Sequence, residues 1–343
     1  MADLTTVSGI TTYLSTTRFK SKNVTLLAGG NANFTFRVLL ETPVELPGGE
    51  KRDSVVVKHA ESFAAFSRDM LFSADRGKYE ALLLKYVYAI TPNLQTSPTL
   101  PVRVPYVYQY DSETHTLFLE DVQNSLTLKE ALSTHVISPS DASKIGEELG
   151  TWLKNFHTFG RNLTASSLDP TSEVARLGKE ISEVDHPLAS AAPTREYGYL
   201  KMALEKMYAG TEEWAKLERV VDEVVPFMQG EIVGGGERGL VVGDFWSGNT
   251  LVSFGGSPSF AEALATTTAT KPVEKVTVID WEMSRPNGNP IFDVAQFLAE
   301  IHLLFSYCHS EAATALAKSF LISYGQLTDE EWRIVVVHVG AHM

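Results

Sequence analysis

The sequence contains a single cysteine, Cys308, among its 343 residues, so no disulfide bond can form within the chain. The opening residues MADLTTVSGITTYL lack the basic start and apolar centre of a secretory signal peptide. No apolar run reaches the length that a membrane-spanning helix requires. These absences predict a soluble, cytoplasmic protein without a membrane partner.

Positive charge is also scarce. The chain has 29 Lys and Arg against 42 Asp and Glu, a formal net charge of -13. Nucleic-acid binding depends on clustered basic residues, so the composition argues against a nucleic-acid partner. The imbalance lies in residues 122–343, which carry 29 acidic and 17 basic side chains. This excess either favours a cationic ligand by long-range attraction or only keeps the protein soluble, and the sequence leaves both interpretations open.

The order of the predicted elements indicates two lobes. At 343 residues with 44% hydrophobic content, the chain is long enough for two domains. Up to residue 121 it is mainly strands, with one helix from Arg76, and afterwards helices dominate. We therefore predict an α+β fold with a small β-rich N-terminal lobe (residues 1–121) and a larger, mostly helical C-terminal lobe (residues 122–343). The predicted strands are 24–27, 34–41, 54–59, 106–110, 115–121, 240–242, 250–254 and 275–281.

The segment LVVGDFWSGNTLV, residues 240–252, interrupts an apolar strand with a polar turn. Asp244 and Asn249 lie five positions apart in this turn, so both side-chain oxygens can face one small volume. Asp244 is placed to accept the proton of an attacking hydroxyl, and Asn249 to bind a metal ion. Asp280 ends the apolar strand of VTVIDWE and is an expected Mg²⁺ ligand, although Asp at a strand end is often only a turn residue.

Two segments of the N-terminal lobe fit the same chemistry. Gly29 and Gly30 lie in a turn between strands, where backbone N–H groups can approach phosphate, although an ordinary hairpin turn also explains them. Lys58 follows three β-branched residues, and the next helix offers Glu80 as a partner. A Lys that only extends to water from the strand end is the alternative. The four elements together, in this order, are typical of a kinase-type phosphotransferase.

These segments resemble the aminoglycoside phosphotransferase and choline kinase group of small-molecule kinases. GDFWSGNTLV is similar to its H-G-D-x-x-x-x-N loop, and VIDWE to its metal-binding I-D-[WFP]-E segment. EELGTWLKNFH resembles its L-x-x-L-H helix and LFLEDV its hinge strand. The resemblance extends from about residue 24 to the end. GGNANFTFRV is most like the methylthioribose kinases, whereas WSGN is similar to fructosamine kinases and fungal 4-hydroxytryptamine kinases.

The resemblance implies a bilobal protein-kinase-like fold, ATP as the phosphate donor and Mg²⁺ as the metal. It implies that Asp244 is the base, that Asn249 and Asp280 hold Mg²⁺, and that Asp293 braces the catalytic loop by capping a helix. The implied nucleotide-binding residues are Gly29, Gly30 and Asn31 over the phosphates, the Lys58–Glu80 ion pair, and the hinge backbone at Glu120, Asp121 and Val122.

The chain departs from the family pattern at two places. Val242 stands where most members have His, and the sequence stops at HVGAHM where relatives continue with further helices. The prediction is an ATP-dependent kinase of a small-molecule hydroxyl, on an amine-bearing alcohol or a sugar such as methylthioribose. A degenerate pseudokinase that binds a nucleotide or metabolite is the alternative, and the oligomeric state is not predicted.

Several aromatic and histidine residues lie near these motifs. Trp246, Trp281 and Glu282 flank the two functional Asp residues and are candidates to line the acceptor pocket, with packing inside the protein as the alternative for the two rings. His338 and His342 lie four positions apart, but without a third ligand nearby a core or surface role is favoured over a metal site. The low-complexity tract 255–274 is predicted to be a mobile loop.

Overall fold

The computed structural model describes residues 2–28, 32–94, 100–161, 169, 171–184, 192–233, 238–255 and 272–342. The chain divides into two compact units. The N-terminal unit consists of Met1–Ile90 and Val104–Gln123, and the C-terminal unit of Thr91–Arg103 and Asn124–Met343. The break after Gln123 lies close to the boundary predicted after residue 121. Thr91–Arg103, which the prediction placed in the first lobe, belongs to the second unit.

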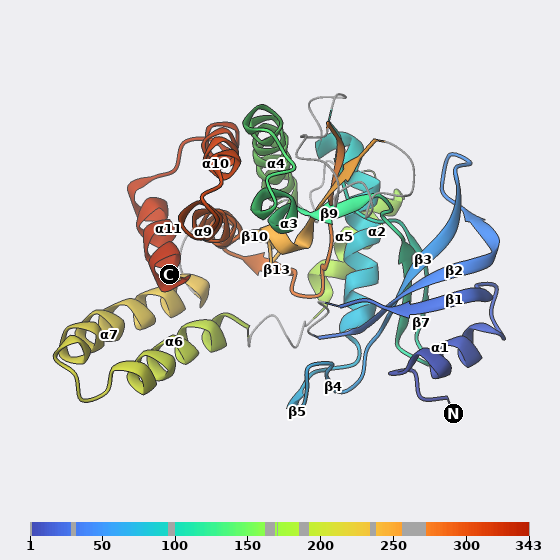
Figure 1. Cartoon of the computed structure of the whole chain (residues 1–343), viewed down its shortest axis with the longest axis horizontal. Coiled ribbons are helices and arrows are strands. Elements are labelled where there is room, and N and C mark those ends of the chain that lie inside the picture. Colours follow the sequence, from blue (N-terminus) through green and yellow to red (C-terminus); the bar gives the residue numbers. More distant parts are fainter. Residues whose placement is uncertain are drawn as a thin grey trace. The chain divides into compact units, whose positions relative to one another are not determined.

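The N-terminal unit is built on a five-stranded antiparallel sheet with strand order β1-β2-β3-β8-β7 (Figure 1). Hairpins join β1 to β2 and β2 to β3, and β8 pairs with β3 on the far side. The strands predicted in this region are confirmed. They are β1 (Ser21–Leu26), β2 (Phe34–Glu45), β3 (Lys51–His59), β7 (Val107–Asp111) and β8 (Thr116–Glu120), and an additional small hairpin consists of β4 (Phe63–Ala64) and β5 (Ser67–Leu71).

Two helices, α1 and α2, are part of the N-terminal unit. α1 (Val7–Leu14) was not predicted, although the Thr6 hydroxyl accepts a hydrogen bond from the Gly9 N–H in an ordinary N-cap. Its buried side chains join the core on the sheet, where Phe19 stacks on Phe118 with ring centroids 4.2 Å apart. α2 (Arg76–Leu94) begins where the sequence predicts.

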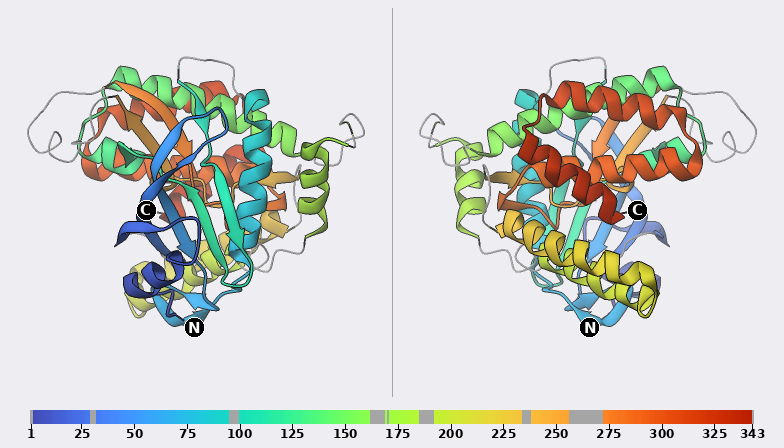
Figure 2. Two further views of the ribbon diagram at one scale, coloured as in Figure 1. Left: turned by 90° about the vertical axis from the view of Figure 1, so that its right-hand side faces the viewer. Right: turned by 90° about the vertical axis from the view of Figure 1, so that its left-hand side faces the viewer.

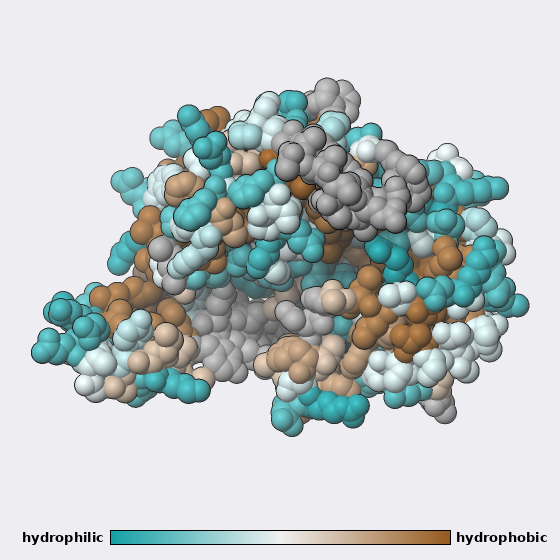
Figure 3. Space-filling model, in the orientation of Figure 1, coloured by the Kyte–Doolittle hydropathy of each residue, from teal (hydrophilic) through white to brown (hydrophobic). Residues whose placement is uncertain are grey.

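The surface of the N-terminal sheet retains apolar residues. Leu26 and Leu39 are exposed on β1 and β2, and the space-filling view shows hydrophobic residues over this sheet (Figure 3). Such exposed side chains are common on folded proteins and do not by themselves mark a site.

The C-terminal unit is mostly helical, as predicted, and α4 and α10 form its tightest pair. A Cβ atom on Gly146 would lie 2.2 Å from the Leu316 carbonyl oxygen, and one on Gly150 would lie 2.3 Å from that of Phe320. Only glycine therefore permits this approach of the two helices. The helices are α3 (Leu128–Ser133), α4 (Pro139–Gly160), α5 (Glu173–Glu183), α6 (Ala192–Tyr208), α7 (Glu212–Val233), α9 (Ile291–Cys308), α10 (Glu311–Tyr324) and α11 (Asp329–His342).

Two small sheets hold the polar turns of this unit. One has strand order β6-β12-β11-β9 and the other pairs β10 with β13. The backbone N–H of Ile279 donates to the carbonyl of Asn249 over 2.9 Å, so the segment after β12 lies beside the 3-10 turn before β11. The predicted loop 255–274 lies almost entirely outside the described residues. The strands are β6 (Val102–Arg103), β9 (Ser125–Thr127), β10 (Gly239–Val241), β11 (Thr250–Phe254), β12 (Val273–Val278) and β13 (Arg285–Gly288), with the 3-10 turn η1 (Ser247–Asn249).

The helices α6 and α7 form an antiparallel pair, seen from two sides in Figure 2. The Tyr197 hydroxyl on α6 hydrogen-bonds Nδ1 of His338 on α11, and His338 is buried. Burial lowers the pKa of His338 to about 3, so the ring is neutral. A core role for His338, favoured over a metal pair with His342, agrees with this position.

α9 has the length and composition of a membrane span, which the sequence analysis did not anticipate. Half of its 18 residues are nevertheless buried inside the protein, as in the core helix of a globular domain. α9 contacts both α10 and α11 in the C-terminal unit. These contacts account for its apolar composition without a membrane.

Candidate active site

The polar turn after β10 is held by a carboxylate from α9. The backbone N–H groups of Val242 and Gly243 donate to Oδ2 and Oδ1 of Asp293, each over 2.8 Å. Asp293 is 1% exposed, so both amides and both oxygens are paired away from water. The carboxylate thereby fixes the backbone directly before Asp244.

Asp293 does not cap α9, which corrects that part of the expectation. The N-cap position belongs to Pro290, and no side chain caps it. Asp293 lies in the first helical turn, where the positive end of the helix dipole favours a carboxylate. The bracing of the loop therefore comes from direct hydrogen bonds to the turn.

A hydrogen-bonded chain extends from Asp293 through the unit. Nε2 of His157 donates to Asp293 Oδ2 over 2.9 Å, and Nδ1 of the same ring lies 3.0 Å from the Tyr324 hydroxyl. His157 is 1% exposed and hydrogen-bonded at both nitrogens. It is a structural residue that orients the carboxylate.

Gly243 is required by the path of the turn. Its φ of +83° is in the left-handed region, and a Cβ atom would lie 2.2 Å from the Met283 carbonyl oxygen. The hydroxyl of Ser284 also donates to the Val242 carbonyl over 2.8 Å. The turn and the segment after Asp280 are therefore in direct backbone contact, even though Val242 replaces the usual His.

Asp244 is held by two amide side chains. Oδ2 accepts from Asn249 Nδ2 over 2.8 Å, and Oδ1 accepts from Gln296 Nε2 over 2.7 Å. Burial, with a further contribution from the charge of Asp280, raises the pKa of Asp244 to about 6, although the hydrogen bonds oppose this shift. A carboxylate with a pKa near neutrality is suited to accept a proton.

Asn249, Asp280 and Glu282 are the candidate oxygen ligands for a metal in the C-terminal unit. The carboxylates of Asp280 and Glu282 approach within 4.8 Å of each other. The Asn249 amide nitrogen is bound to Asp244, and the described residues give its oxygen no hydrogen bond. Carboxylate and amide oxygens are the ligands that Mg²⁺ takes in proteins, so this set fits the implied metal.

The backbone at Asp280 is itself unusual. Its φ of 63° is left-handed, which costs a non-glycine residue about 1–2 kcal/mol. Such conformations persist where the surrounding structure fixes them, and they concentrate at functional sites.

In the N-terminal unit the Lys58 ammonium lies 2.6 Å from Glu80 Oε1. The Glu80 side chain is 1% exposed and that of Lys58 is 12% exposed. The structure thus brings this pair together between β3 and α2. Its role toward a nucleotide stays a prediction, and the predicted phosphate-binding residues Gly29, Gly30 and Asn31 lie outside the described residues.

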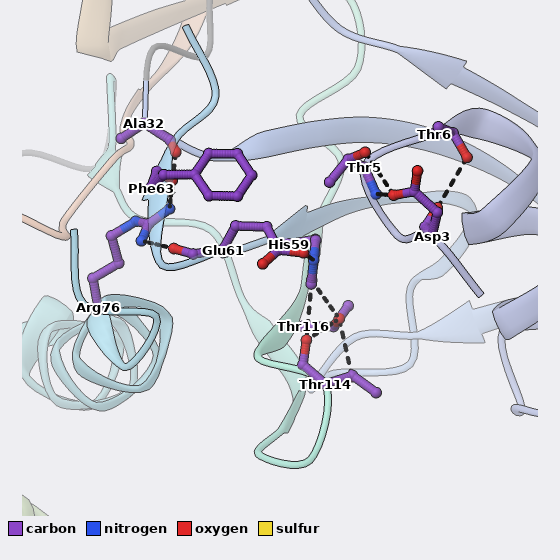
Figure 4. A network of polar contacts seen from close by, with 10 residues as sticks. All are labelled: Asp3, Thr5, Thr6, Ala32, His59, Glu61, Phe63, Arg76, Thr114 and Thr116. Carbon is purple, nitrogen blue, oxygen red and sulfur yellow. Dashed lines mark hydrogen bonds and ion pairs between the residues drawn. The ribbon is translucent and has the colours of Figure 1, made fainter. Parts of the chain in front are cut away.

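A buried arginine holds the backbone that follows this glycine turn, which the sequence analysis missed. Arg76 is 1% exposed and donates to the Ala32 carbonyl over 2.8 Å and to Asn33 Oδ1 over 2.9 Å. It also binds the Glu61 carbonyl over 2.6 Å (Figure 4). Its guanidinium therefore ties the start of α2 to the residues directly before β2 and directly after β3.

The hinge residues are tied into the sheet by their side chains. Asp121 accepts from Arg37 and from the Ser54 hydroxyl, the latter over 2.7 Å. Glu120 pairs with Arg52 at 3.4 Å. Neither carboxylate is therefore open to solvent, and nucleotide binding by the backbone of Glu120, Asp121 and Val122 stays a prediction.

Of the two alternatives expected for Trp281, an acceptor pocket or internal packing, the structure supports packing. It is 0% exposed, its ring packs edge-on against Trp152 and Phe156, and its Nε1 donates to the Val278 carbonyl. The aromatic residues at positions 152 and 156 lie one turn apart on α4, a spacing that indicates a packed face. Trp281 is therefore part of this aromatic core.

Trp246 is only partly buried, and Glu282 is 5% exposed. A Cβ atom on Gly248 would lie 2.3 Å from the Trp246 ring, so the indole lies against backbone. The Lys129 ammonium stands 5.2 Å from the ring centroid. Trp246 already has a cation beside its ring, which weakens the idea that it binds a cationic ligand.

We compared the sequence with known protein families and with curated proteins. No family model matches the sequence. The chain is 24% identical to the 4-hydroxytryptamine kinase of Psilocybe cyanescens over 350 residues, covering 99% of this chain and 86% of that protein. It is also 24% identical to the phosphotransferase FrzJ of Cladobotryum sp. over 341 residues, covering 95% of this chain and 81% of that protein.

Solved structures give weaker likenesses. The choline kinase LicA from Streptococcus pneumoniae has a TM-score of 0.44 and 16% identity, covering 97% of this chain and 86% of that one. A thermostable mutant of aminoglycoside phosphotransferase APH(4)-Ia, in complex with ADP and hygromycin B, has a TM-score of 0.49 and 13% identity, covering 97% and 88%. Likenesses of this size identify no function. The curated relatives are named 4-hydroxytryptamine kinase and phosphotransferase, and their similarity along nearly the whole chain confirms the resemblance to small-molecule kinases that the motifs predict.

Proposed function

We propose that this protein is an ATP- and Mg²⁺-dependent kinase that phosphorylates a hydroxyl group of a small molecule. One observation carries the proposal. The carboxylate of Asp244 is held by two amide donors, Asn249 and Gln296, and it feels the charge of Asp280, whose carboxylate lies within 4.8 Å of that of Glu282. A positioned base next to a set of hard oxygen ligands is the arrangement that phosphoryl transfer needs.

The catalytic roles belong to residues of the C-terminal unit. Asp244 would accept the proton of the acceptor hydroxyl and orient its oxygen toward the transferred phosphoryl group. Asn249 and Asp280 would hold Mg²⁺, and Glu282 adds a further oxygen close to Asp280. When bound, the metal neutralises charge on the nucleotide phosphates. Asp293 would act through the backbone, because it fixes the turn that carries Asp244.

The nucleotide roles belong to the N-terminal unit. Lys58, oriented by Glu80, would pair with phosphate oxygens of ATP, and the turn of Gly29, Gly30 and Asn31 would cover them. The backbone from Glu120 to Val122 would bind the adenine. The short Lys58–Glu80 contact supports the first of these roles, since it holds the ammonium at the strand end.

An amine-bearing alcohol is the acceptor class that we favour. The relative from Psilocybe cyanescens is named a 4-hydroxytryptamine kinase, and such a molecule combines a hydroxyl with an amine. The C-terminal part of the chain is strongly acidic, which attracts cationic molecules. A sugar such as methylthioribose is the second class, and we place the activity in the cytoplasm.

The test is ADP release from Mg-ATP by the purified protein. The acceptor panel contains 4-hydroxytryptamine, choline, methylthioribose, a fructosamine and an aminoglycoside, with Asp244→Asn as the control variant. Acceptor-dependent ADP release that the control lacks is the expected result. Nucleotide binding without turnover on any acceptor would instead identify a degenerate module and reject the proposal.

A further inference from the structure

α9 approaches the catalytic turn at two points. Asp293 binds the backbone N–H groups of Val242 and Gly243, and Gln296 binds the side chain of the next residue, Asp244. Asp293 and Gln296 are three positions apart on the helix, so they lie on the same face. One helix face therefore fixes both the backbone of the turn and the carboxylate that it presents.

The two oxygens of Asp244 have different donors. Oδ2 is bound by Asn249, which belongs to the same turn and moves with it, and Oδ1 is bound over 2.7 Å by Gln296. Gln296 comes from a separate element, 52 positions along the chain. It is therefore the contact that relates the orientation of the carboxylate to the helical core.

The Trp246 side chain, from the same turn, also hydrogen-bonds the Asp244 carboxylate, so Gln296 is the described donor that comes from outside the turn. The last torsion of an Asp side chain has a broad energy profile, so packing alone does not select one rotation of the carboxylate plane. A donor on each oxygen does select it, and it leaves further lone pairs to accept a substrate hydroxyl. Phosphoryl transfer is sensitive to this choice, because attack must occur in line and a displacement of about 1 Å can cost about 100-fold in rate.

We infer that Gln296 is a positioning residue for catalysis, which aligns the Asp244 carboxylate with the acceptor hydroxyl. The inference rests on the proposed function of this site. Gln296 is not among the proposed metal ligands or nucleotide-binding residues. Its loss should therefore lower kcat while nucleotide affinity and the KM for the acceptor stay almost unchanged, whereas a general loss of structure would affect all three.

The experiment compares Gln296→Met with Gln326→Met. Methionine keeps the approximate length of the side chain and removes the amide donor. Gln326 is exposed in the connection between α10 and α11 of the same unit, so the control makes the same chemical change away from the turn. Steady-state rates are measured with Mg-ATP and 4-hydroxytryptamine, or with the acceptor of the panel that reacts fastest, and Mg-ADP affinity is measured by calorimetry.

Gln296→Met is expected to lose about 10-fold to 100-fold in kcat, with less than threefold change in acceptor KM and Mg-ADP affinity. Gln326→Met is expected to retain wild-type values. A kcat within twofold of wild type in folded Gln296→Met would overturn the inference, and so would a parallel loss of nucleotide affinity.

Further variants distinguish a failure of this inference from a failure of the proposed function. If Gln296→Met does not fold, Gln296→Leu also removes the donor without placing a second carboxylate beside Asp244, and it should show the same loss of kcat. Failure of both variants to fold would assign Gln296 to stability and overturn the inference. If the wild-type protein has no acceptor-dependent turnover, the proposed function itself fails. If the wild type turns over, Asp244→Asn does not, and Gln296→Met is fully active, only the role of Gln296 is rejected.

Discussion

Asp293 Oδ1 accepts a hydrogen bond of 2.8 Å from the backbone N–H of Gly243, 50 residues earlier in the chain. With the matching bond from Val242 and the one from His157, this buried carboxylate has three donors. An aspartate can accept all three bonds because both of its oxygens are acceptors. An asparagine has only one acceptor oxygen, so its NH₂ group would face one of the donors and leave that donor unpaired.

Asp293→Asn should therefore lower the free energy of unfolding by about 1–3 kcal/mol, the cost of a buried donor left unpaired. Urea unfolding of the variant measures this change. Asp222→Asn is the control, since Asp222 forms an ion pair with Lys201 at the surface, with its side chain 54% exposed. That control should change stability by less than about 1 kcal/mol. Equal effects at the two positions would argue against bracing of the turn by Asp293.

Gly243→Ala should lower the free energy of unfolding by more than the cost of its left-handed φ angle alone. The left-handed φ costs alanine about 1 kcal/mol, and the clash with the Met283 carbonyl adds about 1–3 kcal/mol. Gly210 is a matched control, because its φ is +81° and a Cβ atom there would meet nothing within 4 Å. Denaturant unfolding should give about 1 kcal/mol for Gly210→Ala and clearly more for Gly243→Ala. The same loss at both sites would show that the close approach to residue 283 is not rigid.

Asp244 should destabilise the unliganded protein at neutral pH. Its folded pKa of about 6 is above the unfolded value of 3.8, so folding opposes ionisation. Below pH 3.8 the group is neutral in both states and carries no cost. As the pH rises from 3.8 through the folded pKa, the unfolded state ionises more readily than the folded state. The free energy of unfolding therefore falls, by up to about 3 kcal/mol.

Between pH 4.5 and pH 7.5 the stability of Asp244→Asn relative to the wild type should therefore rise by about 2 kcal/mol, in addition to a cost of about 1–3 kcal/mol, independent of pH, for the amide group that faces a donor. Thermal unfolding of both proteins between these pH values gives the measurement. A stability difference that is independent of pH would contradict the burial of an ionised Asp244.

Lys58→Met should affect both stability and nucleotide binding. It leaves the buried Glu80 without the Lys58 ammonium, which costs about 3–5 kcal/mol when one partner of a buried pair is removed. In the double variant Lys58→Met with Glu80→Leu, unfolding should return toward the wild-type stability, because replacing both charges with apolar groups is often nearly neutral.

Nucleotide affinity separates the structural from the functional role of this pair. Calorimetry with Mg-ATP should show binding weakened by at least about 10-fold in both variants, equivalent to about 1.4 kcal/mol. Recovery of affinity together with stability in the double variant would mean that Lys58 supports the fold and does not contact phosphate.

Local patterns in the sequence were sufficient for most of the framework. The strands around Lys58 and the helix that carries Glu80 follow from β-branched runs and helical periodicity, and both are present. The turn from Asp244 to Asn249 could be predicted because both residues lie within one short segment. α1 was missed although the N-cap at Thr6 marks its start.

Contacts between distant segments could not be predicted in the same way. The support of Asp244 by Gln296 and the bonds from Asp293 to the turn depend on how α9 packs beside the turn that follows β10, which no local pattern specifies. The sequence left the position of Trp281 open between an acceptor pocket and internal packing for the same reason. An aromatic residue after a functional Asp can face a ligand or the core, and only the packing against Trp152 and Phe156 distinguishes them.

The most direct test of the proposed kinase is the fate of the γ-phosphate. Wild-type protein and Asp244→Asn are incubated with Mg-ATP and 4-hydroxytryptamine or another acceptor of the panel, and the product is identified by mass spectrometry and phosphorus NMR. The account predicts a phosphate ester on an acceptor hydroxyl in the wild-type reaction, and a rate at least about 100-fold lower in the variant. Equal phosphorylation by Asp244→Asn, or no phosphate ester with any acceptor from the folded wild-type protein, would contradict it.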